Sequence, residues 1–282
     1  KTPIDSSNIN PKHWIYLSKI IEKNYLQYDG FVILHGTDTM AYTASALSFL
    51  LEGLSKPVIL TGSQLPVGVG RTDAKENLIT SIEIAINGVI SEVAIYFEYK
   101  LFRGNRTVKI NTNHFEAFDS PNFTPLAESG VTIKYYNTKT PEPTQLLKAY
   151  DTMNDSVGLI KLYPGINERL MYSMLNSDCQ AIVLETFGSG NAPTESTFLQ
   201  MIERQINNGK IILNISQCLA GSVRQGLYET SCELEKIGVI SGKDMTTEAA
   251  ITKLMFLLNQ DLEIDKIKVL LAKSIRGELT EI

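Results

Sequence analysis

Phe31-Val32-Ile33-Leu34-His35-Gly36-Thr37-Asp38-Thr39-Met40 is the stretch that decides the fold. Its first four residues are apolar without polar alternation, which predicts a strand buried on both faces, as in the centre of a parallel sheet. The glycine ends the strand, and Thr37, Asp38 and Thr39 carry side-chain oxygens that can cap a helix beginning directly after them. The turn is therefore expected at the carboxyl edge of the sheet, where open α/β folds bind ligands. From spacing alone, Thr37 and Asp38 fit a catalytic role and a capping role equally well.

Composition excludes several classes of protein. The 282-residue chain is 43% apolar and 20% charged, with a net charge of −5. It has no run of Lys and Arg long enough to predict a nucleic-acid groove, and no apolar stretch near the ~20 residues that span a bilayer. Cys179, Cys218 and Cys232 lack CxxC spacing and predict reduced thiols rather than a disulfide framework or a zinc site. We expect a cytoplasmic protein with no nucleic-acid and no membrane partner.

The remaining patterns predict two α/β domains. In the first part of the chain, the predicted elements are a helix over 11–24, the strand over 31–34, a helix over 41–51, a strand within 56–63, a helix capped by Asp73, and strands over 92–97 and 131–136. This αβαβαβ order predicts a parallel sheet with helices on both sides. Residues 137–156 lack periodicity and contain two prolines, which predicts a linker between a domain at 1–136 and one at 157–282. In the second domain, the predicted strands cover 157–162, 181–186 and 210–215, and the predicted helices cover 167–175, 195–207 and 247–258.

Common catalytic motifs are missing from the sequence. It contains no GxSxG elbow, and no phosphate or dinucleotide loop follows any predicted strand. His13, His35 and His114 are too scattered to predict a metal centre. His35 ends a buried strand and is expected to be a hydrogen-bonded core histidine rather than a base. We therefore expect neither a metal nor a cofactor.

The remaining candidate groups are a hydroxyl, a carboxylate and a lysine. A threonine hydroxyl is a poor nucleophile unless a neighbour accepts its proton, and a neutral lysine can do so. Lys109, which follows Arg106-Thr107-Val108, is the lysine that we would test. Desolvation lowers a lysine pKa and an adjacent carboxylate raises it, so the balance sets the working value. The alternative is a solvated loop lysine.

Several ordered blocks resemble the bacterial type I L-asparaginases. These blocks are Asp5-Ser6-Ser7, His35 to Met40, Lys56 to Gln64, Gly104 to Lys109, Gly188 to Pro193 and Arg276 to Thr280. The resemblance spans essentially the whole chain. It implies the asparaginase/glutaminase fold, with a larger N-terminal flavodoxin-like (Rossmann-like) sheet and a smaller C-terminal parallel α/β sheet.

The resemblance also implies a reaction, the hydrolysis of the side-chain amide of L-asparagine to L-aspartate and ammonia without a cofactor. By position, Thr37, Asp38 and Lys109 match the Thr-Asp-Lys triad of the family. Asp5 and Ser6 match its substrate-binding pair. Asp5 and Asp38 would hold the α-ammonium of the substrate, and Ser6 would contact its α-carboxylate.

Asn191 matches a residue that, in the family, reaches the active site of the neighbouring subunit. The resemblance thus implies a homodimer with the site at its interface, and two such dimers can pair into a homotetramer. Neither the choice between dimer and tetramer nor the preference for asparagine over glutamine follows from these residues.

One departure from the family concerns the first catalytic threonine, which the family carries in an amino-terminal Thr-Gly-Gly-Thr-Ile block. The chain has no Gly-Gly pair. That block would supply a central strand and half of the site, so we expect the 282-residue chain alone to be inactive. The residues leave open whether Thr37 or the other threonine attacks the amide, and whether the reaction is covalent or uses direct attack by water.

A second departure concerns regulation. Some type I enzymes bind asparagine at a separate allosteric pocket built partly from a cysteine and an arginine. Cys218 matches the cysteine, but Glu185 occupies the arginine position and would repel a carboxylate. We expect no allosteric activation by this route, and a sigmoidal dependence of rate on asparagine concentration that Glu185→Ala abolishes would contradict this.

Two other functions fit the same residues. One is the ammonia-releasing component of a tRNA-dependent amidotransferase, which shares the Thr-Asp-Lys core but carries extra sequence. The other is a catalytically dead sensor that binds an amino acid through Asp5, Ser6, Thr37 and Asp38 without turnover.

Overall fold

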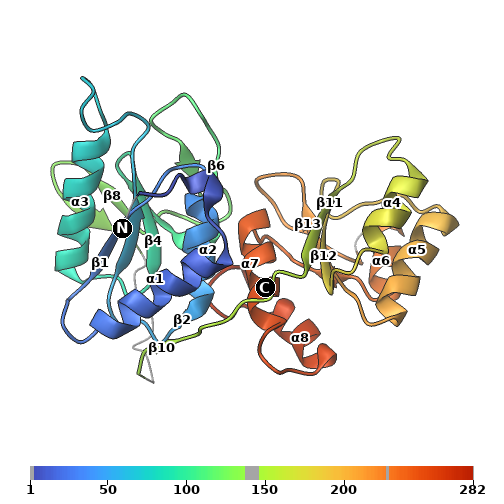
Figure 1. The fold of residues 1–282 in the computed structure, drawn as a ribbon. Helices are drawn as coiled ribbons and strands as arrows, with labels where there is room; N and C mark the ends of the chain where they lie inside the picture. Colours follow the sequence, from blue (N-terminus) through green and yellow to red (C-terminus); the bar gives the residue numbers. More distant parts are fainter. Residues whose placement is uncertain (1–2, 137–145, 227–228, 282) are drawn as a thin grey trace. The chain divides into compact units, whose positions relative to one another are not determined.

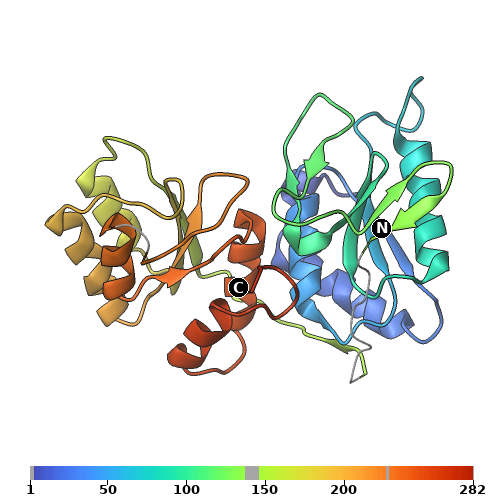
Figure 2. The same ribbon diagram turned by 180° about the vertical axis from the view of Figure 1, so that it is seen from behind.

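The computed structural model describes residues 3–136, 146–226 and 229–281. The chain divides into two compact units, Lys1–Thr152 and Met153–Ile282. Figures 1 and 2 show each unit from opposite sides, and each contains its own sheet with helices on both faces.

The first unit is built on a mixed sheet of six strands in the order β1-β3-β4-β5-β8-β9. The parallel strands are β1 (Phe31–Leu34), β3 (Val58–Thr61) and β4 (Val93–Phe97), and the antiparallel ones are β5 (Lys100–Arg103), β8 (Ala127–Ser129) and β9 (Ile133–Tyr135). The all-parallel sheet predicted for this domain is therefore wrong beyond β4. Only Glu98 and Tyr99 join β4 to β5, both with positive φ (43° and 67°), and a two-residue turn can connect only antiparallel strands.

Helices cover both faces of the parallel part of this sheet. Helices α1 (Pro11–Asn24) and α2 (Met40–Leu50) lie on one face and α3 (Ala74–Asn87) on the other (Figure 1). Side chains alternate accordingly: Val58 and Leu60 pack in the cluster with α1 and α2, whereas Ile59 packs with α3. Because both faces are covered, β3 and β4 are buried along their whole length.

Strand β1 differs from the prediction of a fully buried central strand. Among the described residues it pairs with β3 alone, so it forms an edge of the sheet. Its residues are only half-buried, and Leu34 is 67% exposed. An unbroken apolar run predicts that both faces of a strand are covered, but it does not predict whether the strand has one neighbouring strand or two.

Short elements complete the first unit. They are two 3-10 helices, η1 (Ser6–Asn8) and η2 (Gly104–Arg106), and two short strand pairs, β6 (Val108–Lys109) with β7 (Phe118–Asp119) and β2 (Leu51–Glu52) with β10 (Lys148–Ala149). The predicted linker over 137–156 is described from residue 146 onward. Its strand β10 pairs with β2, and residues 146–152 belong to the first compact unit, whereas residues 153–156 belong to the second.

The second unit confirms the predicted parallel sheet. Its strands are β11 (Val157–Lys161), β12 (Ala181–Thr186), β13 (Ile211–Ser216) and β14 (Ile240–Ser241), paired in that order. Helices α4 (Glu168–Leu175), α5 (Ser196–Asn207) and α6 (Glu229–Lys236) lie on one face, and α7 (Thr247–Leu257) and α8 (Ile264–Leu271) lie on the other (Figures 1 and 2).

A fully buried ion pair holds the C-terminal segment of the second unit. Lys253 and Glu278 are both 0% exposed, and their Nζ and Oε1 atoms are 2.5 Å apart. Lys253 Nζ also donates to the carbonyl oxygens of Leu271 and Lys273, and the Glu278 carboxylate accepts from the N–H of Ile275. Burial lowers the pKa of Lys253, and the Glu278 carboxylate opposes that shift.

We predict that Lys253→Met destabilises the protein by about 3–5 kcal/mol, because it removes the buried cation that pairs with the Glu278 carboxylate. Urea unfolding measures the loss. The double variant Lys253→Met/Glu278→Gln removes both charges and should lose less than the single variant. A single variant as stable as the wild type would contradict this assignment.

Candidate active site

The turn after β1 is fixed by backbone contacts rather than by helix capping. His35 N donates to Thr61 O of β3 at 2.8 Å, which continues the pairing of β1 one residue past its end. Helix α2 begins at Met40, and its N-cap residue Thr39 makes no capping hydrogen bond. Thr39 Oγ1 instead donates to Ser6 O at 2.6 Å. The capping interpretation of this turn is therefore wrong.

Lys109 joins the two other side chains of the turn. Its Nζ donates to Thr37 Oγ1 at 2.8 Å and to Asp38 Oδ1 at 2.7 Å. The Lys109 side chain is 16% exposed, whereas that of Asp38 is 65% exposed. The pairing of Lys109 with Phe118 in the β6–β7 hairpin fixes the direction from which this lysine approaches. The structure thus brings together the three residues predicted as a triad, and Lys109 is not a solvated loop lysine.

Ser6 lies against the same turn. It is 5% exposed, and its Oγ would lie 2.7 Å from a Cβ placed on Gly36, so only glycine allows this approach. Asp5 is exposed, and its Oδ1 accepts from Ser7 N at 2.9 Å and Ser7 Oγ at 2.7 Å. These hydrogen bonds lower the pKa of Asp5, so its carboxylate is ionised at neutral pH.

Gln64 is a further site residue; it ends the block Lys56 to Gln64, but the sequence analysis predicted no role for it in the site. It follows β3, the strand next to β1, and its Oε1 is 3.5 Å from Thr37 Oγ1. Its Nε2 donates to Thr112 O and His114 O beyond Lys109, and Asp73 holds its backbone N–H. The position of Gln64 directly after a predicted strand could have indicated this role, because the carboxyl ends of neighbouring parallel strands meet at one edge of the sheet. A contact of 3.5 Å is weak, so it constrains the Thr37 hydroxyl proton little.

Asn191 lies in the second unit, in the turn after β12. Phe187 and Asn191 exchange two backbone hydrogen bonds, of 2.9 and 2.8 Å, which close this turn. Asn214, fully buried on β13, supports it: its Nδ2 donates to Gly190 O, and its Oδ1 accepts from Thr186 Oγ1. The predicted role of Asn191 concerns a neighbouring subunit and stays a prediction.

Glu185 and Cys218 also lie in the second unit. Thr247 Oγ1 donates to Glu185 Oε1 at 2.6 Å, and Lys161 Nζ is 3.3 Å from Glu185 Oε2. The Glu185 carboxylate is therefore already paired, whereas Cys218 is exposed and free.

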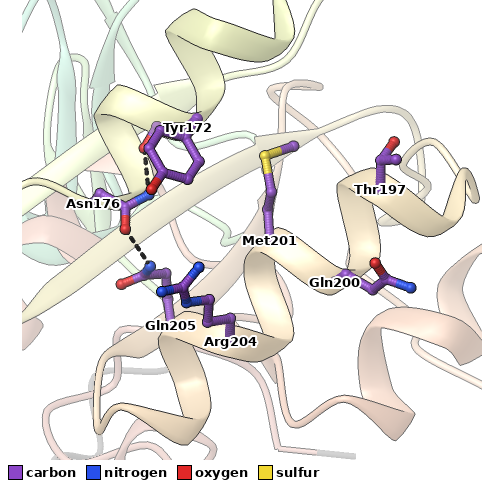
Figure 3. A pocket seen from close by; sticks show the side chains of 7 residues that line it. All are labelled: Tyr172, Asn176, Thr197, Gln200, Met201, Arg204 and Gln205. Carbon is purple, nitrogen blue, oxygen red and sulfur yellow. Dashed lines mark hydrogen bonds between the residues drawn. The ribbon is translucent and has the colours of Figure 1, made fainter.

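Two of the hollows formed by the described residues lie outside the triad. The first, of about 330 Å³, borders the site and is lined by residues of η1, α1, β1 and the turn after β1, including Ser6, His35 and Gly36. The second, of about 320 Å³, lies between α4 and α5 of the second unit (Figure 3). There Gln205 Nε2 donates to Asn176 Oδ1 at 2.9 Å, and the Asn176 amide donates to Tyr172 O, so the amides of its floor bond to each other and to the backbone.

Two general features bear on the chemistry. Within residues 3–136, 146–226 and 229–281, no group of three or more His, Cys, Asp or Glu side chains is arranged to hold a metal ion. In the same residues, no helix is both long and apolar enough to cross a membrane.

Comparison with known proteins identifies the family. Residues 1–141 match the family model "Asparaginase, N-terminal", and residues 156–271 match "Glutaminase/Asparaginase C-terminal domain". L-asparaginase 1 of Escherichia coli (strain K12) is 44% identical over 99% of this chain and 83% of its own length. The chain belongs to the asparaginase family.

Two further relatives bear on the alternatives. The crystal structure of L-asparaginase I from Vibrio cholerae superposes with a TM-score of 0.94 at 44% identity, covering 99% of this chain and 84% of that one. A component of the glutamyl-tRNA(Gln) amidotransferase of Pyrococcus abyssi is 34% identical over 98% of this chain, which spans 65% of that protein. The type I asparaginases are thus more similar to this asparaginase in both sequence and length.

Proposed function

We propose that the Thr37–Lys109–Asp38 site hydrolyses the side-chain amide of L-asparagine to L-aspartate and ammonia. The observation that carries the proposal is the position of Lys109 Nζ, within hydrogen-bonding distance of both Thr37 Oγ1 and Asp38 Oδ1. Family membership and the 44% identity to L-asparaginase 1 support the same reaction.

Lys109 is proposed as the proton carrier of this reaction. In its neutral form it accepts the Thr37 hydroxyl proton, and Asp38 stabilises the ammonium that results. The Thr37 oxygen can then attack the amide carbon itself, or take the proton of another attacking hydroxyl. When the C–N bond breaks, Lys109 returns the proton to the leaving nitrogen, which departs as ammonia. Water supplies the oxygen of the new carboxylate, so the sum is asparagine plus water to aspartate plus ammonia.

The substrate would be held by the carboxylates of Asp5 and Asp38, which suit its α-ammonium group. Asp5 is ionised at neutral pH, as this contact requires, because hydrogen bonds from Ser7 lower its pKa. Ser6 packs against Gly36, next to Thr37, where its hydroxyl can meet the α-carboxylate. These contacts account for a small zwitterionic substrate whose side-chain amide lies at Thr37.

We propose a homodimer or a dimer of dimers, in which Asn191 contributes to the site of a neighbouring subunit. The closed turn at Phe187–Asn191, supported by Asn214, would present that side chain in a fixed position. A cytoplasmic location agrees with the three free cysteines, Cys179, Cys218 and Cys232.

We predict that the 282-residue chain alone releases little or no ammonia from asparagine, because β1 has an open edge and its last residue, Leu34, is exposed beside the turn that holds Thr37. The comparison is with an extended chain, which carries at its amino end the Thr-Gly-Gly-Thr-Ile segment of a family member. Equal rates for the two chains would contradict the prediction. A folded extended chain that binds aspartate but has no turnover would favour the sensor.

We predict that Lys109→Met in the extended chain lowers kcat by roughly 10²–10⁴-fold, the usual contribution of a positioned proton carrier. KM should change little, because Asp5, Asp38 and Ser6 remain in place. Lys75→Met, an exposed change on α3, is the matched control and should leave kcat unchanged. Retained turnover in Lys109→Met would remove the lysine from the mechanism.

A further inference from the structure

A chain of hydrogen bonds runs from the helices to the catalytic turn without including Thr37 or Asp38. Trp14 Nε1 of α1 donates to Thr43 Oγ1 of α2 at 3.0 Å. Thr43 Oγ1 lies 2.8 Å from His35 Nε2, and His35 Nδ1 lies 2.6 Å from Gly36 O. Trp14 and Thr43 are 6% and 0% exposed, so water competes little for the hydrogen bond between them, whereas the His35–Gly36 hydrogen bond lies at the exposed end of the series.

The chemistry of the four groups fixes which atom donates in each of these hydrogen bonds. A carbonyl oxygen can only accept, so His35 Nδ1 must carry a proton. Burial lowers the pKa of His35, partly opposed by the hydrogen bond to Gly36 O, so the ring is neutral and Nε2 has no proton. The Thr43 hydroxyl therefore donates its proton to Nε2. The Trp14 N–H, which can only donate, binds a lone pair of the same hydroxyl oxygen.

The last hydrogen bond of the series holds the peptide bond between Gly36 and Thr37. In a planar trans peptide the C=O and N–H groups point in opposite directions, so a fixed Gly36 carbonyl also fixes the direction of the Thr37 N–H. Ser6 packs against the α-carbon of Gly36 and limits movement of the same peptide. Within the described parts of the chain, the Thr37 N–H has no hydrogen-bond acceptor.

We propose that Trp14, Thr43 and His35 are positioning residues that hold the Gly36–Thr37 peptide, leaving the Thr37 N–H free for an oxygen of the substrate. Thr43 and Trp14 do this by keeping His35 in the Nδ1–H tautomer, the only neutral form that can donate to Gly36 O. Hydrogen bonds in series polarise one another, which makes the Thr37 N–H a stronger donor. The inference rests on the proposed hydrolysis, because it assigns a purpose to a peptide of that same site.

Other ionisable groups lie near His35. His13 and Tyr16 of α1 line the same hollow, and Asp5 and Asp38 lie in the two segments that meet Gly36. A change in the pH profile must therefore be traced to His35 itself, which NMR of its ring nitrogens does.

The first test uses the extended chain and the pair Thr43→Val and Thr43→Ser. Valine has the shape of threonine without its hydroxyl, so kcat should fall roughly tenfold with little change in KM, as expected for one lost hydrogen bond near the reacting atoms. Serine keeps the hydroxyl and should restore most of the rate. At position 35, His35→Asn keeps an N–H donor for Gly36 O and should be faster than His35→Leu. Wild-type kcat and pH profile in Thr43→Val would overturn the proposal.

The second test reads the tautomer directly in the ¹⁵N-histidine-labelled 282-residue chain. His35 should show a protonated Nδ1 and a bare, hydrogen-bonded Nε2, and the Nε2 shift should move to its unbonded value in Thr43→Val. An Nε2–H tautomer in the wild type would overturn the proposal whether or not the enzyme hydrolyses asparagine. If the wild-type extended chain has no turnover, the proposed function fails, and the tautomer result then decides whether the positioning chain exists.

Discussion

The contact of Lys109 Nζ with Thr37 Oγ1 and Asp38 Oδ1 is the interaction on which the site depends. The residues that it joins lie more than 70 positions apart, so the fold itself must bring them together. The parallel pairing of β1 with β3 positions Thr37 and Asp38, because β1 ends at the turn that holds them. The β6–β7 hairpin positions Lys109, because the pairing with Phe118 fixes its backbone. A shift in either element would separate the hydroxyl from the lysine.

The turn is held from several sides, which explains why so many of its side chains do not cap α2. Thr39 binds the backbone of Ser6, His35 binds the carbonyl of Gly36, and Gln64 links the turn to the segment after Lys109. Thr37 and Asp38 are thereby left to Lys109. A helix N-terminus without its usual caps leaves backbone N–H groups available, which suits a site for a carboxylate-bearing substrate. Local stability and chemistry are thus divided between neighbouring residues of one short segment.

Much of this arrangement could be predicted from the sequence, because its signals are local. The helices over 11–24 and 167–175 and the strand over 181–186 follow from the spacing of their apolar residues. The antiparallel strands after β4 could not be predicted, because Glu98 and Tyr99 are not typical residues for a turn with positive φ. The exposure of β1 was also missed, since an apolar run looks the same in a central strand and at an uncovered edge. For the site, Thr37, Asp38 and Lys109 came from a motif, whereas Gln64 and the Trp14–Thr43–His35 chain depend on which strands and helices are neighbours.

The central proposal is that one binding site is formed by the segments at Asp5–Ser6, Thr37–Asp38 and Lys109. A crystal structure of the extended chain with L-aspartate, the product, tests this most directly. We expect the α-ammonium between Asp5 and Asp38, the α-carboxylate at Ser6 and the side-chain carboxylate at Thr37, with Lys109 still bridging Thr37 and Asp38. Aspartate bound only elsewhere, for example in the hollow between α4 and α5, or a Lys109 turned away from Thr37 in the complex, would contradict the proposal.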